Sequence, residues 1–248
     1  MYRFALRPRW IAGHVLVAVA VAVMVSLAFW QFRRLDERKA QNERVAERMA
    51  APEVDLGEVA GEPLRDVEFR TVAATGTFDG AHDVLVGFRT RNGLPGYHVV
   101  TSLVLDDGTA VLVNRGFVPL DLAERWRDEP APAGPQRVVG ILRGSYDART
   151  DTATPGEDGA PPKLNAVDVD AIDPYVPRDL LPFHVELQSP VPPGFPEPLP
   201  PLDLGEGPHL SYAIQWLSFA TVAAVGWGFV LRRTARRRTG RAMRVTVP

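Results

Sequence analysis

The sequence predicts a membrane protein in which two transmembrane α-helices flank an extracytoplasmic α+β domain, whose mainly antiparallel sheet forms a small barrel or sandwich. Two apolar runs, with short β-branched segments between them, indicate this fold class. Residues 10–32 contain no Asp, Glu, Lys or Arg and a single histidine, His14, and residues 210–231 contain no Asp, Glu, Lys, Arg or His. At about 1.5 Å per residue, each run is long enough to cross a hydrocarbon core about 30 Å thick.

The first run must be compared with a cleavable signal peptide, because basic residues precede it and Ser26-Leu27-Ala28 resembles a cleavage site. A span is favoured, because the run is longer than a typical signal core, ends at Phe29-Trp30 and leads into a charged helical segment. The predicted division of the chain is a cytoplasmic N-terminus at 1–9, a transmembrane helix at 10–32, an extracytoplasmic domain at 33–209 with a helical stalk at 33–50, a transmembrane helix at 210–231 and a basic cytoplasmic tail at 232–248.

Charge asymmetry around the second run sets the expected orientation. Residues 190–209 contain no Lys or Arg, whereas seven arginines follow position 231. The positive-inside rule therefore places both termini in the cytoplasm. All 30 acidic residues lie between the two runs, so nucleic-acid binding is not expected, and the arginine-rich tail suits anionic lipid head groups.

Composition also limits the compartment and the chemistry. The absence of cysteine excludes disulfides, thiol metal sites and cysteine nucleophiles. Only nine residues precede the first run and arginine outnumbers lysine, so we expect a multi-pass protein of the bacterial plasma membrane. The sequence has none of the common hydrolase, metalloprotease, P-loop or dinucleotide motifs, and no enzymatic activity is expected.

Short β-branched segments broken by turn residues indicate five strands between residues 67 and 146. Asp106-Asp107-Gly108 is a hairpin signal between two of them. We expect a polar loop at 147–162, a short helix at 171–181 and an extended proline-rich segment at 189–208. The expected strands are VEFRTVAATGTF, DVLVGFRT, GYHVVTSLVL, TAVLVNRGFV and QRVVGILRGSY.

Isolated polar residues in this domain are interpreted as structural. The alternating Asp168, Asp170 and Asp173 lack the glycine and distal glutamate of a calcium loop, so they are expected to form a solvated face. The three scattered histidines are each expected to be satisfied surface or sheet residues. They are His82, His98 and His184.

Four stretches give the chain a resemblance to the surfeit locus protein 1 family, assembly factors for haem-copper cytochrome c oxidase. The stretches are FWQFRRLDERK, GYHVVTSL, VLVNRGFVP and HLSYAIQWLSFA. They occur in the family's order, and the resemblance covers nearly the whole chain. The family's motif at the end of the first span is matched by Trp30, Gln31, Arg34 and Arg38, its V-x-R-G-W-V-P signature by Val113, Arg115, Gly116, Val118 and Pro119, and its H-x-x-Y-A-x-Q-W opening by His209, Tyr212, Ala213, Gln215 and Trp216. Phe117 replaces the usual Trp, and Ser102 an often-present Pro.

The resemblance implies a bacterial oxidase assembly factor that binds haem a, transiently, and aids its insertion into subunit I. Oxidase subunits, haem a synthase and the lipid bilayer are the implied partners. The implied cofactor-binding residues are His209, Tyr212, Trp216, Trp30, Gln31 and Arg34, with His209 as the axial ligand of the haem iron.

The spacing of the second run can be compared with this implication. His209, Tyr212, Ala213, Trp216, Ala220 and Trp227 share one helical face, where alanines between aromatics leave room for a flat macrocycle. The alternative is ordinary: His, Tyr and Trp are common interfacial anchors, and Arg34 and Arg38 can snorkel rather than meet propionates. Trp30 and Gln31 lie at the same boundary and are expected to pack against His209.

Three smaller expectations concern packing. His14, near the opposite boundary, is expected to snorkel and not to act as a second ligand. Small residues at 18, 22 and 26, and at 220, 224 and 228, are spaced for close helix pairing. Arg115 is expected to fix a strand turn, with a partner contact as the alternative, and Gly116 to permit close backbone approach.

Two other functions remain open from the sequence. A membrane scaffold would bind oxidase subunits without touching haem. An extracytoplasmic sensor would bind a small ligand and signal through the spans, but the short basic tail offers no output module.

Overall fold

A computed structural model describes residues 3–123, 126, 131–146, 162–190 and 194–244 of the chain. The chain divides into two compact units, one made of residues 1–43 and 204–248 and the other of residues 44–203. Most of the polar loop expected at 147–162 and the last four residues of the basic tail lie outside the described residues.

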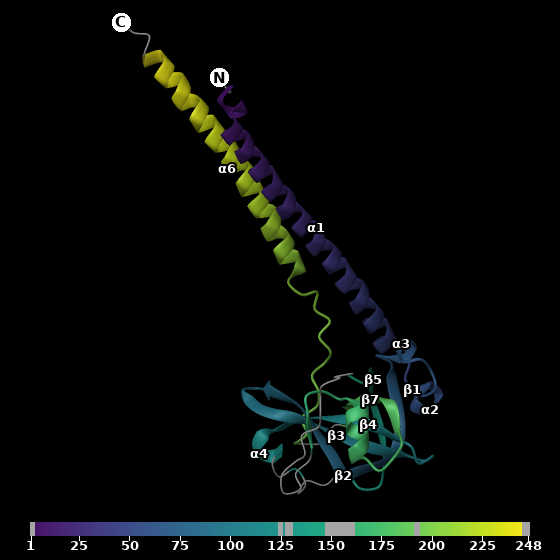
Figure 1. The fold of residues 1–248 in the computed structure, drawn as a ribbon. Coiled ribbons are helices and arrows are strands. Elements are labelled where there is room, and N and C mark those ends of the chain that lie inside the picture. The colour runs from purple at the N-terminus through teal and green to yellow at the C-terminus, as the bar shows by residue number, and fades with distance from the viewer. Residues whose placement is uncertain (1–2, 124–125, 127–130, 147–161, 191–193, 245–248) are drawn as a thin grey trace. The chain divides into compact units, whose positions relative to one another are not determined.

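The first unit is a pair of long helices, which Figure 1 shows side by side. A short 3-10 turn, Arg3–Leu6, precedes α1, Pro8–Ala50. The first residue of α1 is a proline, which suits this position because a backbone N–H there would have no acceptor within the helix. No Gly or Pro interrupts α1 after Gly13, so the charged stretch of the expected stalk is helical as far as Ala50. The partner helix is α6, His209–Arg244.

The two helices run antiparallel, because His14 near the start of α1 meets Trp227 far along α6, while Gln31 meets the first residue of α6. Trp227 donates from Nε1 to Nδ1 of His14 at 2.8 Å. Gly13 makes room for this indole, since a Cβ there would lie 2.7 Å from the Trp227 ring. The expectation that His14 snorkels is therefore wrong: its imidazole joins the helices.

The small residues expected to pair the helices are only partly at the contact. Ala220 of α6 is 5% exposed, but Ala18, Ala22 and Ser26 of α1 are exposed. The Ser26 hydroxyl bonds to the Ala22 carbonyl of its own helix. The fully buried Ala28, with Gly13, lies on the paired face instead.

Both helices are long and apolar enough to span a membrane. Only 6% of the apolar 18-residue stretch of each helix is buried within the protein, so these are not core helices of a soluble domain. A continuous exposed apolar surface of this kind is typical of helices that lie against lipid. Its largest exposed members include Val15, Leu16, Val19, Val23, Phe29, Ile214, Val222, Val225 and Phe229.

The second unit contains a sheet of seven strands with short helices between them. Its strands are β1 Val54–Asp55, β2 Thr71–Arg91, β3 Leu94–Leu105, β4 Ala110–Pro119, β5 Pro135–Gly144, β6 Lys163–Leu164 and β7 Leu180–Ser189. Its short helices are α2 Leu56–Val59, α3 Leu64–Val67, α4 Leu120–Ala123 and α5 Val169–Ile172, and a 3-10 turn follows at Asp173–Tyr175.

The strand order is β1-β2-β3-β4-β7-β5, and β5 also pairs with β2, so the path of backbone hydrogen bonds returns to β2. The ladders β2–β3, β3–β4, β2–β5 and β5–β7 are antiparallel. The pairs β1–β2, β2–β6 and β4–β7 are parallel. The domain is thus mostly sheet and mainly antiparallel, as the sequence predicts.

Three predicted elements differ in detail. The first two expected strands are one long strand, β2, whose register shifts between Asp79 and Val84, so the break between the patterns is an irregularity rather than a loop. The last strand, β7, was not predicted, because its first residues overlap the expected helix at 171–181. That helix is only one turn of α5 plus a 3-10 turn.

Two other local predictions hold, the second of them only in part. The Asp106-Asp107-Gly108 segment joins β3 to β4, with Gly108 at φ +87° and Asp107 Oδ1 accepting from the Thr109 amide at 2.9 Å. The solvated face expected at Asp168, Asp170 and Asp173 is found only at the exposed Asp170 and Asp173. Asp168 is buried instead, and it caps α5 by accepting from the Ala171 amide at 3.2 Å.

The proline-rich segment that leads to α6 lies as an extended chain against β4. Phe117 and Glu197 exchange two backbone hydrogen bonds of 2.8 Å. Gly116, at φ +125°, permits this contact because it lacks a Cβ. A Cβ at this position would lie 2.1 Å from the Glu197 carbonyl oxygen. The expected close backbone approach at Gly116 is confirmed, and the approaching chain is the connection to the second long helix.

Candidate functional site

The residues implied by the resemblance meet where the connecting segment enters α6. His209, the first residue of α6, and Gln31, on α1, are 178 positions apart in sequence. Nδ1 of His209 lies 2.8 Å from Oε1 of Gln31, and Gln31 is only 8% exposed. The predicted packing of Gln31 against His209 is confirmed.

This contact matches one tautomer of the imidazole, the one in which Nδ1 carries the proton. An amide oxygen only accepts hydrogen bonds, so Nδ1 of His209 must donate. In the neutral ring, the lone pair is then on Nε2, the nitrogen that remains to bind a metal. A hydrogen-bond acceptor for one ring nitrogen orients a ligating histidine and increases the basicity of the other nitrogen, which binds the metal.

The other implied residues lie within two turns of Gln31 or His209 on the same helices, and none of them shares the hydrogen bond of this pair. Trp30 and Tyr212 are 45% and 47% exposed, and Trp216 is half-buried. The Arg34 guanidinium lies over the Trp30 ring, 5.9 Å from its centre, and pairs with Glu37 at 2.8 Å on the exposed side of α1. Arg34 is therefore held at the surface, where it can reach an anionic group.

The alanine face of α6 is not an open groove. Ala213 is completely buried and Ala220 nearly so, on the same stripe as His209 and Trp227, which both bond to α1. The expected room for a macrocycle between these alanines is occupied by helix pairing. A ligand of His209 would have to approach from the exposed side, beside Tyr212 and Trp30.

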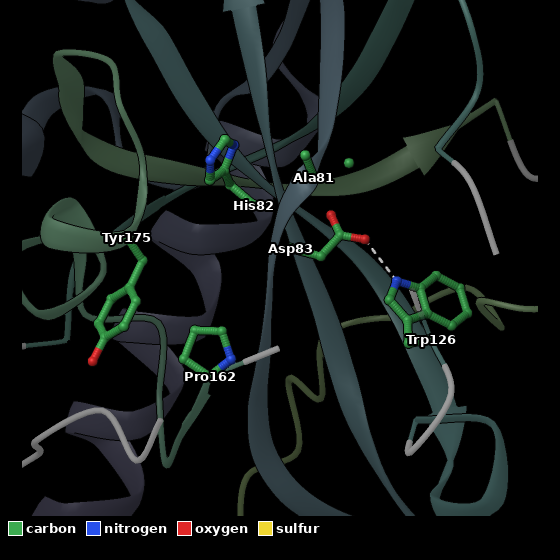
Figure 2. Close-up of a pocket in the computed structure, with 7 residues that line it drawn as sticks. Ala81, His82, Asp83, Trp126, Pro162 and Tyr175 are labelled. Carbon is green, nitrogen blue, oxygen red and sulfur yellow. Dashed lines mark hydrogen bonds between the residues drawn. The ribbon is translucent and has the colours of Figure 1, made fainter. Parts of the chain in front are cut away.

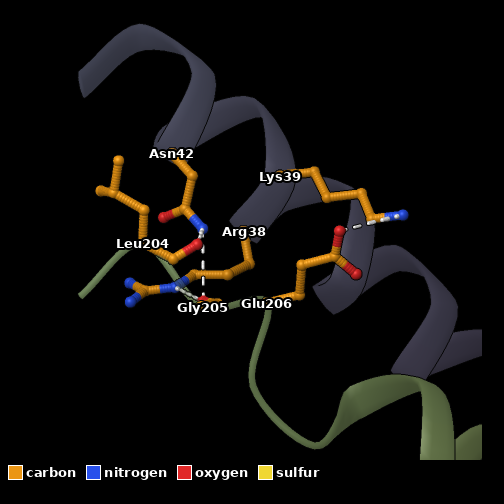
Figure 3. Close-up of polar contacts among 6 residues, drawn as sticks. All are labelled: Arg38, Lys39, Asn42, Leu204, Gly205 and Glu206. Carbon is orange, nitrogen blue, oxygen red and sulfur yellow. Dashed lines mark hydrogen bonds and ion pairs between the residues drawn. The ribbon is translucent and has the colours of Figure 1, made fainter. Parts of the chain in front are cut away.

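Polar contacts fasten the connecting segment to α1 just before His209 (Figure 3). Asn42 donates to the Leu204 carbonyl at 2.5 Å, and Arg38 donates to the Gly205 carbonyl at 3.3 Å. Lys39 pairs with Glu206 at 3.5 Å. Arg38 thus has a backbone partner, and the motif arginine positions the start of α6.

The donor set at this boundary is compatible with haem. A neutral imidazole with a fixed tautomer is a common axial ligand, and exposed aromatic side chains beside it can contact a porphyrin face. Arginine is the preferred partner for a carboxylate such as a propionate. Among the described residues, no group of three His, Asp or Glu side chains could hold a bare metal ion.

A buried polar cluster in the sheet domain was not predicted from the sequence (Figure 2). The Asp83 carboxylate accepts from Thr101 Oγ1 at 2.5 Å and from Trp126 Nε1 at 2.6 Å. Arg115, only 6% exposed, approaches it to 4.0 Å and lies over the rings of Phe78 and Trp126. The expectation that Arg115 fixes a strand turn is wrong, because it is a core residue of β4.

Burial raises the pKa of Asp83 against the lowering effect of Thr101, Trp126 and Arg115. A cavity of about 160 Å³ beside it is lined by His82, Tyr175 and Pro162. His82 pairs with Asp79 at 2.8 Å and is half-exposed, so its predicted surface character is confirmed. Two hydrogen-bond donors and the nearby Arg115 guanidinium satisfy the Asp83 carboxylate, so this cluster is a structural one.

The chain is similar in sequence to known proteins. The sequence model of the SURF1 family matches residues 18–221. An uncharacterized SURF1-like protein of Mycobacterium tuberculosis is 28% identical over 238 residues, covering 91% of this chain and 84% of its own. A SURF1-like protein of Monosiga brevicollis is 32% identical over 191 residues, covering 71% of each chain.

Proposed function

Because the chain belongs to the SURF1 family, we propose that it is an assembly factor for haem-copper cytochrome c oxidase that binds haem a through His209 and aids its insertion into subunit I. The family is one of assembly factors rather than catalysts, linked to oxidase assembly in general. The haem step is the specific part of the proposal.

The hydrogen bond between His209 and Gln31 is the observation that carries the haem assignment. It holds the ring in one orientation and leaves Nε2 as the ligand nitrogen. An interfacial anchor would need neither a fixed tautomer nor a buried amide partner. The neighbouring exposed side chains of Tyr212, Trp30 and Arg34 supply ring contacts and a cation.

In this account each residue has a limited task. His209 binds the iron, Gln31 holds its proton at Nδ1, and Arg34 neutralises a propionate. Trp216, half-buried beside this site, contributes packing. Haem a is the cargo in this account. A single protein ligand to the iron permits transfer, because a site with one coordinate bond releases haem more readily than a site with two.

The proposed location is the bacterial plasma membrane, with α1 and α6 as spans and both termini in the cytoplasm. The exposed apolar surface of both helices supports insertion, and the arginines after position 231 support the orientation. The sheet domain then lies outside the cytoplasm. Subunit I and a haem a synthase are the partners that this role requires, within the same bilayer.

Deletion of the gene tests the assembly role. Assembled, haem-loaded oxidase should fall while its subunits continue to be synthesised, because an assembly factor acts after translation. Full oxidase content and activity in the deletion strain, with no second copy of the gene, would refute the proposal.

A scaffold that binds oxidase subunits without haem is the second candidate. The contacts of Asn42, Arg38 and Lys39 with the segment before α6 favour it, because they explain the polar residues at this boundary by helix joining alone. A scaffold would purify colourless from haem a-producing cells and still comigrate with the oxidase. A haem carrier would show a Soret band.

A further inference from the structure

A second cavity in the sheet domain has the features of a ligand site and has no role in the proposed haem chemistry. It has a volume of about 520 Å³ and lies on one face of the sheet, beneath residues 165–167. Strands β2, β3, β4, β5 and β7 all contribute side chains to it. The acidic and basic side chains that line it are Glu68, Arg89, His98, Arg143, His184 and Glu186.

Two buried polar atoms at this cavity lack a hydrogen-bond partner among the described residues: Nδ1 of His184 and Nη1 of Arg143. His184 is 93% buried, with 7% of its surface exposed. The two residues are directly paired across β5 and β7, so their side chains leave the same face of the sheet. Leaving such groups unpaired destabilises the fold, so a bound partner is expected.

The Arg143 guanidinium is fixed in place by its other contacts. It lies over the Phe69 ring, 4.4 Å from the centre, and its Nε is 3.9 Å from Glu186 Oε1. Nη1 is therefore the nitrogen left for a ligand. Because it is a guanidinium N–H, the ligand must accept a hydrogen bond there.

The state of the His184 ring follows from its two nitrogens. Burial and the charge of Arg143 lower the pKa of His184 to about 4, while a backbone hydrogen bond with Gly144 raises it. A bond that favours the charged ring is one that the ring donates. With Nδ1 unpartnered, the donor is Nε2, and the neutral ring has a buried lone pair at Nδ1.

We propose that this cavity binds a small carboxylate, whose two oxygens accept hydrogen bonds from Arg143 Nη1 and from a protonated His184 Nδ1. Binding takes up one proton from solvent: the ligand brings one negative charge and the ring gains one positive charge. A planar group with two adjacent oxygens suits one free guanidinium N–H beside one imidazole. A phosphate dianion would add a second negative charge beside Glu186.

The charged groups around His184 agree with this choice. Arg143 comes from β5, Glu186 from β7 itself, Glu68 from the chain after α3, and Arg89 and His98 from β2 and β3. Arg89 and Arg91 also lower the pKa of His98, which burial already lowers, to about 4. The cavity thus presents a positive field to its two imidazoles, which an anion would relieve.

NMR of the full-length protein in detergent, with 15N-labelled histidine, tests the proposal at the predicted atom. The chain has only five histidines, and His184→Gln identifies the signal. At pH 7, propionate should convert His184 from the neutral Nε2–H form to the doubly protonated form, in a saturable manner. As the pH rises toward the pKa of the bound ring, propionate affinity should fall by up to tenfold per pH unit, and above that pKa it should level off.

Propionamide and ethyl phosphate are the matched probes, and neither should protonate His184. Arg143→Leu should weaken propionate binding at least tenfold. Arg137→Leu, on the same strand but with an exposed side chain paired to Glu53, should leave binding unchanged. If Arg143→Leu does not fold, the comparison of propionate with propionamide in the wild type still decides.

Two results would overturn the proposal. Unchanged histidine signals with propionate in excess would mean that the cavity holds only structural water, which can also bridge one donor and one acceptor. An equal response to ethyl phosphate would contradict the preference for a carboxylate. The haem assignment at His209 is independent of both results.

Discussion

The Asp83 carboxylate is a buried charge of the sheet domain with two short hydrogen bonds, and it explains why an arginine stands before Gly116. Its two short hydrogen bonds come from residues on other segments, Thr101 and Trp126, and Arg115 balances its charge. A buried ion pair adds little net stability, but each partner compensates the buried charge of the other. The motif arginine is thus a core residue.

Asp83→Asn should destabilise the sheet domain by about 3–5 kcal/mol, because Arg115 then remains buried without a counter-charge. The double variant Asp83→Asn/Arg115→Met should lose less than the single variant. Urea unfolding of the three proteins measures this difference. Additive losses in the double variant would show that the two side chains are not coupled.

Single residues were predictable from the sequence where they belong to a short motif. Gln31 and His209 could be placed at one boundary because each lies at the end of an apolar run. The burial of Arg115 could not be predicted, because its partner Asp83 is on another strand and the aromatic contact comes from Trp126. The free Nδ1 of His184 was missed for the same reason: no local pattern shows which polar atoms a fold leaves unpaired.

Among the structural elements, the connection between the sheet and α6 depends on one glycine. Glu197 lies against β4 through Gly116, and Arg91 pairs with the Glu197 carboxylate at 3.1 Å. Arg91 also donates to the Pro198 carbonyl. The R-G-F motif is therefore the place where the segment leading to the second long helix is docked.

Gly116→Ala should release this segment, because the new Cβ would meet the Glu197 carbonyl at a left-handed backbone position. Faster proteolysis between residues 194 and 206 is the expected result, with a loss of stability well above 1 kcal/mol. Gly108→Ala is the matched control: its φ is +87° but nothing lies near its Cβ, so only about 1 kcal/mol of backbone strain is expected. Equal effects of the two substitutions would exclude the docking role.

Elements were predicted well where one period dominates. The two apolar runs and the β3–β4 hairpin follow from composition and turn residues alone. The strand β7 was missed because Pro182 and a preceding apolar pair obscure its alternation, and its parallel pairing with β4 depends on contacts distant in sequence. The continuity of β2 was missed because the glycine at 80 resembles a turn.

For the protein as a whole, the buried histidines make stability depend on pH. Burial lowers the pKa of His98 and His184 to about 4, from 6.5 in the unfolded chain. Their contribution to stability is complete above pH 6.5 and is lost as pH falls through about 4. Raised pKa values at Asp83 and Glu186 act in the opposite direction.

Between pH 7 and pH 4 the wild type should lose free energy of unfolding. His184→Gln should therefore reduce that loss, by at most about 3 kcal/mol. Urea unfolding at several pH values, compared with the wild type, measures this. An identical pH profile would mean that folding does not shift the pKa of His184. His82→Gln, which removes a half-exposed ring, is the control and should change the profile little.

The charge distribution predicts the orientation of the whole chain in the membrane. Alkaline phosphatase fused after residue 248 should be inactive, and a fluorescent protein fused there should be bright, because the arginines after position 231 hold this end in the cytoplasm. Fusions after residue 120 should behave in the opposite way. Active phosphatase at the C-terminus would contradict the proposed topology.

The haem assignment is tested most directly by the absorption spectrum of protein purified from haem a-producing cells, with His209→Ala beside the wild type. We predict a Soret band in the wild type that is lost or shifted in His209→Ala, while the variant stays in the membrane and stable. His14→Ala is the matched control, since it too breaks a bond between α1 and α6 yet should leave the spectrum unchanged. An unchanged Soret band in His209→Ala would contradict the account and reduce His209 to a residue that joins two helices.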